Sequence, residues 1–130
     1  MAVSKSSLSA GAIIRAVLLA DPEVASRTNK IFPIVSSSSE LPYIVYRRAE
    51  LAANPQKSGQ LGSDTIQMEV TCYTAKYAEG VELAEAVRNA LDYESSEHDG
   101  LTMRGCYLAA GEEGYQDDAF VQQLIFSIKI

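Results

Sequence analysis

The stretch from Asp64 to Asp92 constrains the fold more than any other, because the hydrophobic period changes within it. Polar and apolar residues alternate from Thr65 to Tyr73, and the apolar positions are Ile66, Met68, Val70 and Cys72. Successive side chains leave a strand on opposite faces, so this pattern predicts a half-buried strand. From Ala75 to Asp92 apolar residues recur every three or four positions, which predicts an amphipathic helix with Thr74 as its N-cap. The turn is short, so the helix is expected to pack over the apolar face of its own strand.

A first helix is predicted from Ser7 to Ala20, and it ends where Asp21 precedes Pro22. Its core stripe consists of Ile13, Ile14, Val17 and Leu18. A second apolar side, formed by Leu8, Ala12 and Leu19, needs a cover of its own. That cover is either another part of the same chain or a neighbouring subunit. One further turn of helix is expected at Pro22–Ser26.

Four more strands are predicted, and the first is an edge strand because it contains Pro33. They span Ile31–Val35, Pro42–Ala49, Leu101–Ala110 and Ala119–Ile130. The connections between elements include a long segment, Glu50–Ser63, and two acidic loops, Tyr93–Gly100 and Gly111–Asp118. A long connection without secondary structure is usually functional or mobile, and we expect residues 50–63 to be mobile.

This order of elements predicts an α+β fold in which two helices pack on one face of a largely antiparallel or mixed sheet of about five strands. The 130 residues are expected to form a single domain, with residues 1–6 as a flexible N-terminus. Cys72 and Cys106 fall inside predicted strands and are interpreted as small buried hydrophobes, with a disulfide between them as the less favoured alternative.

The formal net charge of −6 argues against a protein that binds a nucleic-acid backbone. The charge is also uneven: residues 1–60 carry seven basic and four acidic groups (+3), and residues 61–130 carry four and thirteen (−9). This pattern fits either a solvated acidic face or a polarised surface that meets copies of itself. No apolar run approaches the roughly 20 residues that span a bilayer, and no signal-peptide pattern is present, so the cytoplasm is the expected compartment.

No constellation of residues predicts catalysis, a cofactor or a metal. A single histidine, His98, cannot build a histidine metal centre, and it lacks zinc-ligand spacing with the two cysteines. Gly111 and Gly114 enclose two glutamates, which would repel a phosphate, so this segment is read as a turn. The nearby carboxylates lack the calcium-loop pattern. We therefore expect no catalytic, cofactor-binding or metal-binding residue.

Three motifs in a fixed order resemble a known family. The first two are Lys30-Ile31-Phe32-Pro33 and Leu41-Pro42-Tyr43-Ile44-Val45-Tyr46. The third is a helix of the form Tyr-x5-Leu-Ala-x2-Val-Arg-x-Ala-Leu, which covers Tyr77–Leu91. Together they resemble the bacteriophage tail-terminator, or tail-completion (minor tail), proteins of tailed phages and prophages. Cys72 departs from the family pattern, where a larger aromatic residue is expected.

The resemblance implies a structural protein without a catalytic residue. Such proteins form a hexameric ring that caps the finished tail tube, ends its polymerisation and offers the surface that joins the head. The implied partners are other copies of the chain, the tail-tube protein and a head-completion or connector protein, with DNA passing through without specific binding. The implied location is the host cytoplasm during assembly and then the virion tail. The alternatives are a head–tail connector of similar fold and, in another class, a small enzyme or ligand-binding α+β domain.

Two candidate surfaces follow. The resemblance places the long connection at contacts with neighbouring subunits or the tube, through Asn54, Pro55, Lys57, Gly59 and Gly62. The second surface is an acidic hairpin with Glu112, Glu113, Asp117 and Asp118. A negative wall lets DNA pass, because it gives no cation to replace the counterions on the phosphates. The hairpin therefore either lines the lumen or is a solvated turn that faces outwards, and the sequence supports the two readings equally.

Overall fold

The computed structural model describes residues 3–38, 40–54 and 64–130. Asp21 ends the first helix and caps the second: its carboxylate accepts a hydrogen bond from the Val24 backbone N–H at 3.0 Å. The helices are a short 3-10 turn at Ser7–Ser9, α1 (Ala10–Ala20), α2 (Pro22–Ala25) and α3 (Tyr77–Leu91). The strands are β1 (Ile31–Pro33), β2 (Tyr43–Ala52), β3 (Thr65–Thr74), β4 (Ser96–His98), β5 (Leu101–Met103), β6 (Gly105–Gln116) and β7 (Ala119–Lys129).

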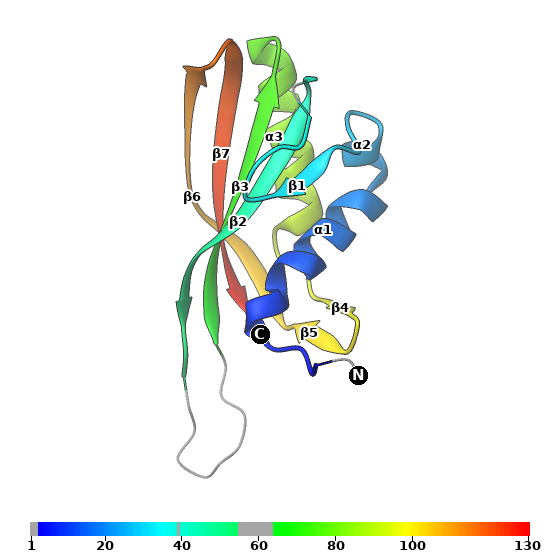
Figure 1. The fold of residues 1–130 in the computed structure, drawn as a ribbon, viewed down its shortest axis with the longest axis vertical. Helices are drawn as coiled ribbons and strands as arrows, with labels where there is room; N and C mark the ends of the chain where they lie inside the picture. Colours follow the sequence, from blue (N-terminus) through cyan, green and yellow to red (C-terminus); the bar gives the residue numbers. More distant parts are fainter. Residues whose placement is uncertain (1–2, 39, 55–63) are drawn as a thin grey trace.

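Five strands form one mixed sheet in the order β1-β2-β3-β7-β6, and β4 pairs with β5 in a separate two-stranded sheet. Only the β1–β2 pair in the large sheet is parallel. Figure 1 shows α1 and α3 on one side of the large sheet, with the other side uncovered. The predicted α+β class, with about five strands and two helices on one face, is confirmed.

The strand–helix unit lies at the centre of this arrangement, as its sequence pattern predicts. The four apolar side chains of β3, which are Ile66, Met68, Val70 and Cys72, are completely buried. In the neighbouring strand, Phe126 lies opposite Met68, and α3 presses Leu83 and Val87 onto the same core. The predicted N-cap is wrong: Lys76 holds that position without a side-chain bond, and the Thr74 hydroxyl donates to the Lys76 carbonyl at 2.8 Å.

The predicted acidic loop Gly111–Asp118 is wrong, because β6 continues to Gln116 and pairs with β7 along its whole length. The connection consists of Asp117 and Asp118 alone, with φ angles of 52° and 62°. Two residues with positive φ are typical of the tight hairpin turn whose twist matches that of its strands. Glycine and glutamate disfavour strands, and pairing with the strongly apolar β7 overrides that local preference.

Pairing also changes the other predicted boundaries. β2 extends to Ala52, beyond the predicted end, because residues 50–52 continue the antiparallel ladder with β3 after a bulge. The predicted strand Leu101–Ala110 divides at Arg104, and its two parts belong to different sheets. Its first part pairs with Ser96–His98, inside the predicted Tyr93–Gly100 loop. Short polar strands of this kind carry little hydrophobic pattern, so sequence periodicity does not reveal them.

The first helix is buried mainly on one side, where Ile13, Ile14 and Leu18 are completely buried against the sheet. On the predicted second apolar side, Leu19 is partly buried against the same core, whereas Leu8 is 64% exposed. What covers Leu8 stays a prediction. Both cysteines are buried and free, and β7 separates the two strands that carry them, which excludes a bond between adjacent strands. No helix among the described residues is long and apolar enough to cross a membrane.

Candidate assembly surfaces

The described part of the chain holds no group of three or more residues that could ligate a metal ion. Its two thiols are unsuited to nucleophilic chemistry, because burial raises the pKa of both Cys72 and Cys106 to about 12. His98 lies exposed on β4, which belongs to a different sheet from the two thiol-bearing strands. The candidate sites among the described residues are therefore surfaces.

The acidic hairpin presents its carboxylates in three directions. Glu112 pairs with Gln123 and Glu113 with Gln122 in the β6–β7 ladder, so the two glutamates leave the strand on opposite faces. Glu112 lines a hollow on the uncovered face of the sheet. Asp117 and Asp118 form the turn itself, where aspartate tolerates positive φ better than most residues. The sequence analysis predicts that these four residues form one acidic surface. In the structure they lie around the end of the hairpin and point in different directions.

Glu113 is held on the helix-covered side of the sheet. Its Oε2 accepts a hydrogen bond from the Gln122 amide at 2.8 Å and another from the Tyr77 hydroxyl at 2.9 Å. The Gln122 and Tyr77 bonds lower the pKa of the Glu113 carboxyl, and the hydrogen bond to Glu113, followed by the charge of Glu113, raises the pKa of the Tyr77 hydroxyl. This contact fastens the β6–β7 hairpin to the start of α3. Nothing in the sequence spacing of these residues indicates it.

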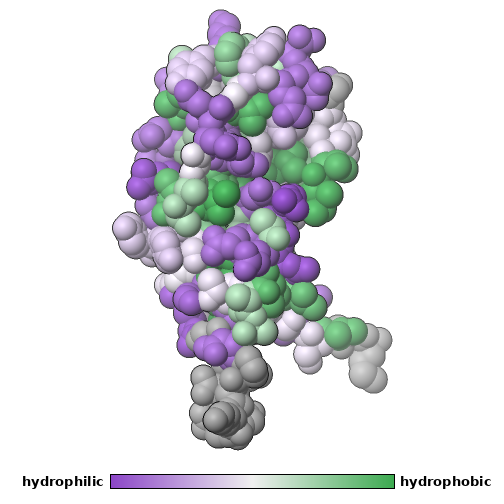
Figure 2. Space-filling model, turned by 90° about the vertical axis from the view of Figure 1, so that its left-hand side faces the viewer, coloured by the Kyte–Doolittle hydropathy of each residue, from purple (hydrophilic) through white to green (hydrophobic). Residues whose placement is uncertain are grey.

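The uncovered face contains a groove, formed by two adjoining hollows of about 210 and 220 Å³ that share Tyr73 and Gln116. On its floor the rings of Tyr43 and Tyr73 stack with centroids 4.8 Å apart. Figure 2 shows this side of the molecule, where hydrophobic surface lies among hydrophilic patches. The remaining lining includes Ile34, Val35, Val45, Thr71, Glu112, Tyr115, Asp117 and Val121.

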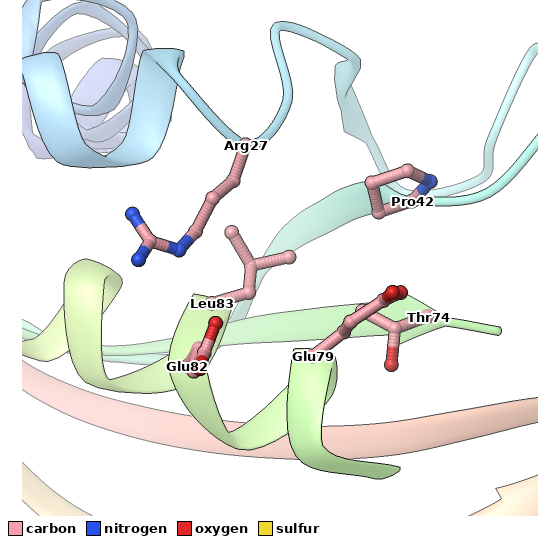
Figure 3. Close-up of a pocket in the computed structure, with 6 residues that line it drawn as sticks. All are labelled: Arg27, Pro42, Thr74, Glu79, Glu82 and Leu83. Atoms are coloured by element: carbon pink, nitrogen blue, oxygen red, sulfur yellow. The ribbon is translucent and has the colours of Figure 1, made fainter. Parts of the chain in front are cut away.

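A third hollow, of about 260 Å³, lies between the end of α2 and the start of α3. Figure 3 shows Arg27 extending towards α3, with Leu83 and Glu82 below it and with Glu79 farther along, beside Thr74. Arg27 already pairs with Glu23 at 3.1 Å, and every buried side-chain polar atom in the described residues has a partner. The hollow thus offers solvated charges and no buried, unsatisfied group that would indicate a ligand.

The predicted contact loop lies mostly outside the described residues: Pro55, Lys57, Gly59 and Gly62 belong to the range 55–63. Asn54 is described, and its backbone N–H donates to Asp64 Oδ1 at 3.2 Å. The other carboxylate oxygen of Asp64 accepts the Ser7 hydroxyl, and these two bonds lower the pKa of Asp64. Asp64 thereby links the N-terminal 3-10 turn to the β2–β3 hairpin, a role that its sequence position does not indicate.

Comparisons with known proteins found one matching family and solved structures of similar fold. A family model described as "Tail completion protein gp17" matches residues 12–130. No curated protein matches the chain. A solved structure of the virion of a native gene transfer agent particle contains a chain with 19% sequence identity and a TM-score of 0.79. The match covers 95% of this chain and 98% of that one, and at this identity it shows a shared fold. Since the family model spans nearly the whole chain, the protein belongs to the tail completion protein gp17 family, a family of structural tail proteins.

Proposed function

We propose that this protein caps the tail tube as a homo-oligomeric ring, ends tube polymerisation and provides the surface to which the head binds. The observation that carries the proposal is membership of the tail completion family over residues 12–130. A structural role is also consistent with the described residues, among which no group of three or more could ligate a metal ion. The ring would be hexameric, would meet the tail-tube protein on one side and a head-completion protein on the other, and would form in the host cytoplasm before entering the virion tail.

Uneven charge supports a head-to-tail contact between copies. Residues 1–60 carry a net charge of +3 and residues 61–130 a net charge of −9. A contact between two different patches closes into a ring when the rotation between copies is right. Salt screens exposed charges over about 8 Å at physiological ionic strength, so the ring is expected to loosen as salt rises.

The test is the assembly of the purified protein on purified tail tubes. Light scattering across a salt series gives the mass of the free protein, and electron microscopy shows whether rings sit at tube ends and whether tubes stop growing. A protein that stays monomeric at every salt and concentration, with tubes present, contradicts the proposal. Rings that bind empty heads but not tubes would favour the head–tail connector instead.

We further propose that the acidic hairpin lines the lumen through which DNA passes. The residues are Glu112, Glu113, Asp117 and Asp118. In the particles that assemble, replacing all four by lysine should slow or stall DNA ejection, because lysines replace phosphate counterions. The matched control replaces them by glutamine and asparagine, which removes charge but keeps the turn. Unchanged ejection in the lysine variant, or a ring with this hairpin on its outer rim, contradicts the lumen assignment.

The connection 50–63 is proposed as a contact with the neighbouring subunit or the tube, through Asn54, Pro55, Lys57, Gly59 and Gly62. Hydrogen exchange on the free protein and on tube-bound protein tests this. Protection of these amides should rise on assembly, whereas β3 amides serve as an internal control that is protected in both states. Equal exchange of residues 53–63 in the two states contradicts the contact.

A further inference from the structure

Ile34 occupies a backbone conformation that is rare for a β-branched residue. Its φ angle is 67°, and the Val35 N–H donates to the Pro33 carbonyl across it at 2.7 Å. A three-residue turn with this hydrogen bond and positive φ is the rare, strained form of the γ-turn, and a β-branched residue there is a conformational outlier. Strain of this kind persists at sites where it serves a function.

The same turn exposes two large apolar side chains. Ile34 is 63% exposed and Val35 is 70% exposed, and both stand at one end of the groove on the uncovered face. The opposite end of the groove holds Glu112, and Asp117 lies beside Tyr73 between the two ends. The groove therefore has apolar side chains at one end, Glu112 at the other, and Asp117 in the same hollow as Ile34 and Val35, which suits an occupant with an aliphatic and a basic side chain.

The N-terminal segment of the chain has this character. Residues 3–6 are all exposed, and the segment carries Val3, which is 81% exposed, and Lys5. Its base is held in place, because Ser7 is buried against Asp64 and Arg48 donates to the Leu8 carbonyl at 2.8 Å. Ser6 is extended, with φ −138° and ψ −171°. Residues 3–6 are therefore an exposed segment whose attachment point at Ser7 is held in place, and such a segment can bind to another subunit.

The lengths also agree. Val3 and Lys5 are two positions apart, which spans roughly 7 Å of extended chain, and the flexible four-carbon stem of lysine extends the reach of its ammonium group further. The groove crosses from β2 to β6, which are separated by three strand spacings, or roughly 14 Å. Figure 1 shows the 3-10 turn and the start of α1 in the lower half of the view and the β6–β7 turn at the top, so the segment before Ser7 does not occupy the groove of its own subunit.

We propose that the N-terminal segment of one copy lies in the groove of the next, with Val3 against Ile34 and Val35 and with Lys5 near Glu112. This assignment rests on the proposed ring and names the contact that builds it. A groove-to-groove contact would set carboxylates against carboxylates, so the charges favour the head-to-tail arrangement. One lysine against the four hairpin carboxylates leaves a net charge of −3 per subunit (+1 − 4), which is compatible with an acidic lumen.

The first test compares Ile34→Asn with Tyr93→Asn. Both positions have positive φ and expose a large hydrophobic side chain, but Tyr93 lies outside the groove. Asparagine relieves the backbone strain at both, so neither variant should fold less well than the parent. Ile34→Asn should raise the dissociation constant between copies by more than tenfold through the lost apolar contact, and Tyr93→Asn should leave it unchanged.

The second test reverses charge. Lys5→Glu should weaken association about two- to fivefold, as expected for an exposed ion pair, and combination with Glu112→Lys should restore it. Lys76→Glu, an exposed reversal on the helix-covered side, is the control. The readout is sedimentation equilibrium of the full chain across a dilution series. Rings that form equally well with Ile34→Asn, or a charge swap that fails to rescue Lys5→Glu, overturn this contact but leave the ring intact. A parent protein that forms no ring contradicts the proposed function itself.

Discussion

Replacing Val87 by aspartate should unfold the domain at neutral pH. Val87 is completely buried where α3 packs on the sheet. Losing the two buried methyl groups costs about 2 kcal/mol of apolar burial, at roughly 0.8 kcal/mol per buried carbon group. A buried carboxyl has a pKa raised by roughly 3 units, and each unit is worth 1.36 kcal/mol, so ionisation costs about 4 kcal/mol more. The total of about 6 kcal/mol lies within the whole stability of about 5–15 kcal/mol that is typical of a domain.

Two further variants separate the cost of the lost apolar burial from the cost of the buried charge. Val87→Ala should lose only the apolar part, and Asn89→Asp, at an exposed site two residues away, should change stability by less than about 0.5 kcal/mol. Urea denaturation between pH 7 and pH 4 adds a signature of its own. The buried aspartate has a raised pKa, so its penalty is complete at neutral pH and shrinks as falling pH protonates it. A soluble Val87→Asp protein with an unchanged melting temperature would refute the packing of α3 on β3.

Two further predictions concern the hairpin and the start of α3. Glu113 has a pKa held below its ordinary 4.5, so its bonds to Tyr77 and Gln122 stabilise the fold above about pH 4.5 and are lost as pH falls through the lowered value. Glu113→Gln should therefore melt below the parent at pH 7, and this difference should shrink as falling pH protonates the Glu113 carboxylate; a deficit that does not change as the pH falls contradicts the electrostatic origin. Gly80→Ala should not increase the free energy of unfolding by the roughly 1 kcal/mol expected from helix propensity, because the new Cβ would lie 2.8 Å from the Thr74 hydroxyl oxygen. A melting temperature raised by the full amount would show that the contact between position 80 and Thr74 is not tight.

The elements that could be predicted from the sequence are those whose burial leaves a regular pattern. The alternation from Ile66 to Cys72 and the 3.6-residue period of α3 each report one buried face, and the structure buries those faces completely or nearly so. The same patterns determine the α+β class. Periodicity works here because the hydrophobic effect acts on every residue of a face, so the signal accumulates over ten or more positions.

Where the signal depends on a partner distant in the chain, tertiary structure decided the outcome. Residues 111–116 carry glycines and glutamates that favour a loop, and they form a strand because β7 lies beside them. Glu113 and Tyr77 are 36 residues apart and meet only through the sheet. The strained turn at Ile34 and the groove beside it likewise could not be predicted from the sequence. The turn type depends on backbone angles, and the groove forms only when pairing brings its strands together. Local sequence records how a residue is buried, and only the folded chain determines which surfaces remain open for assembly.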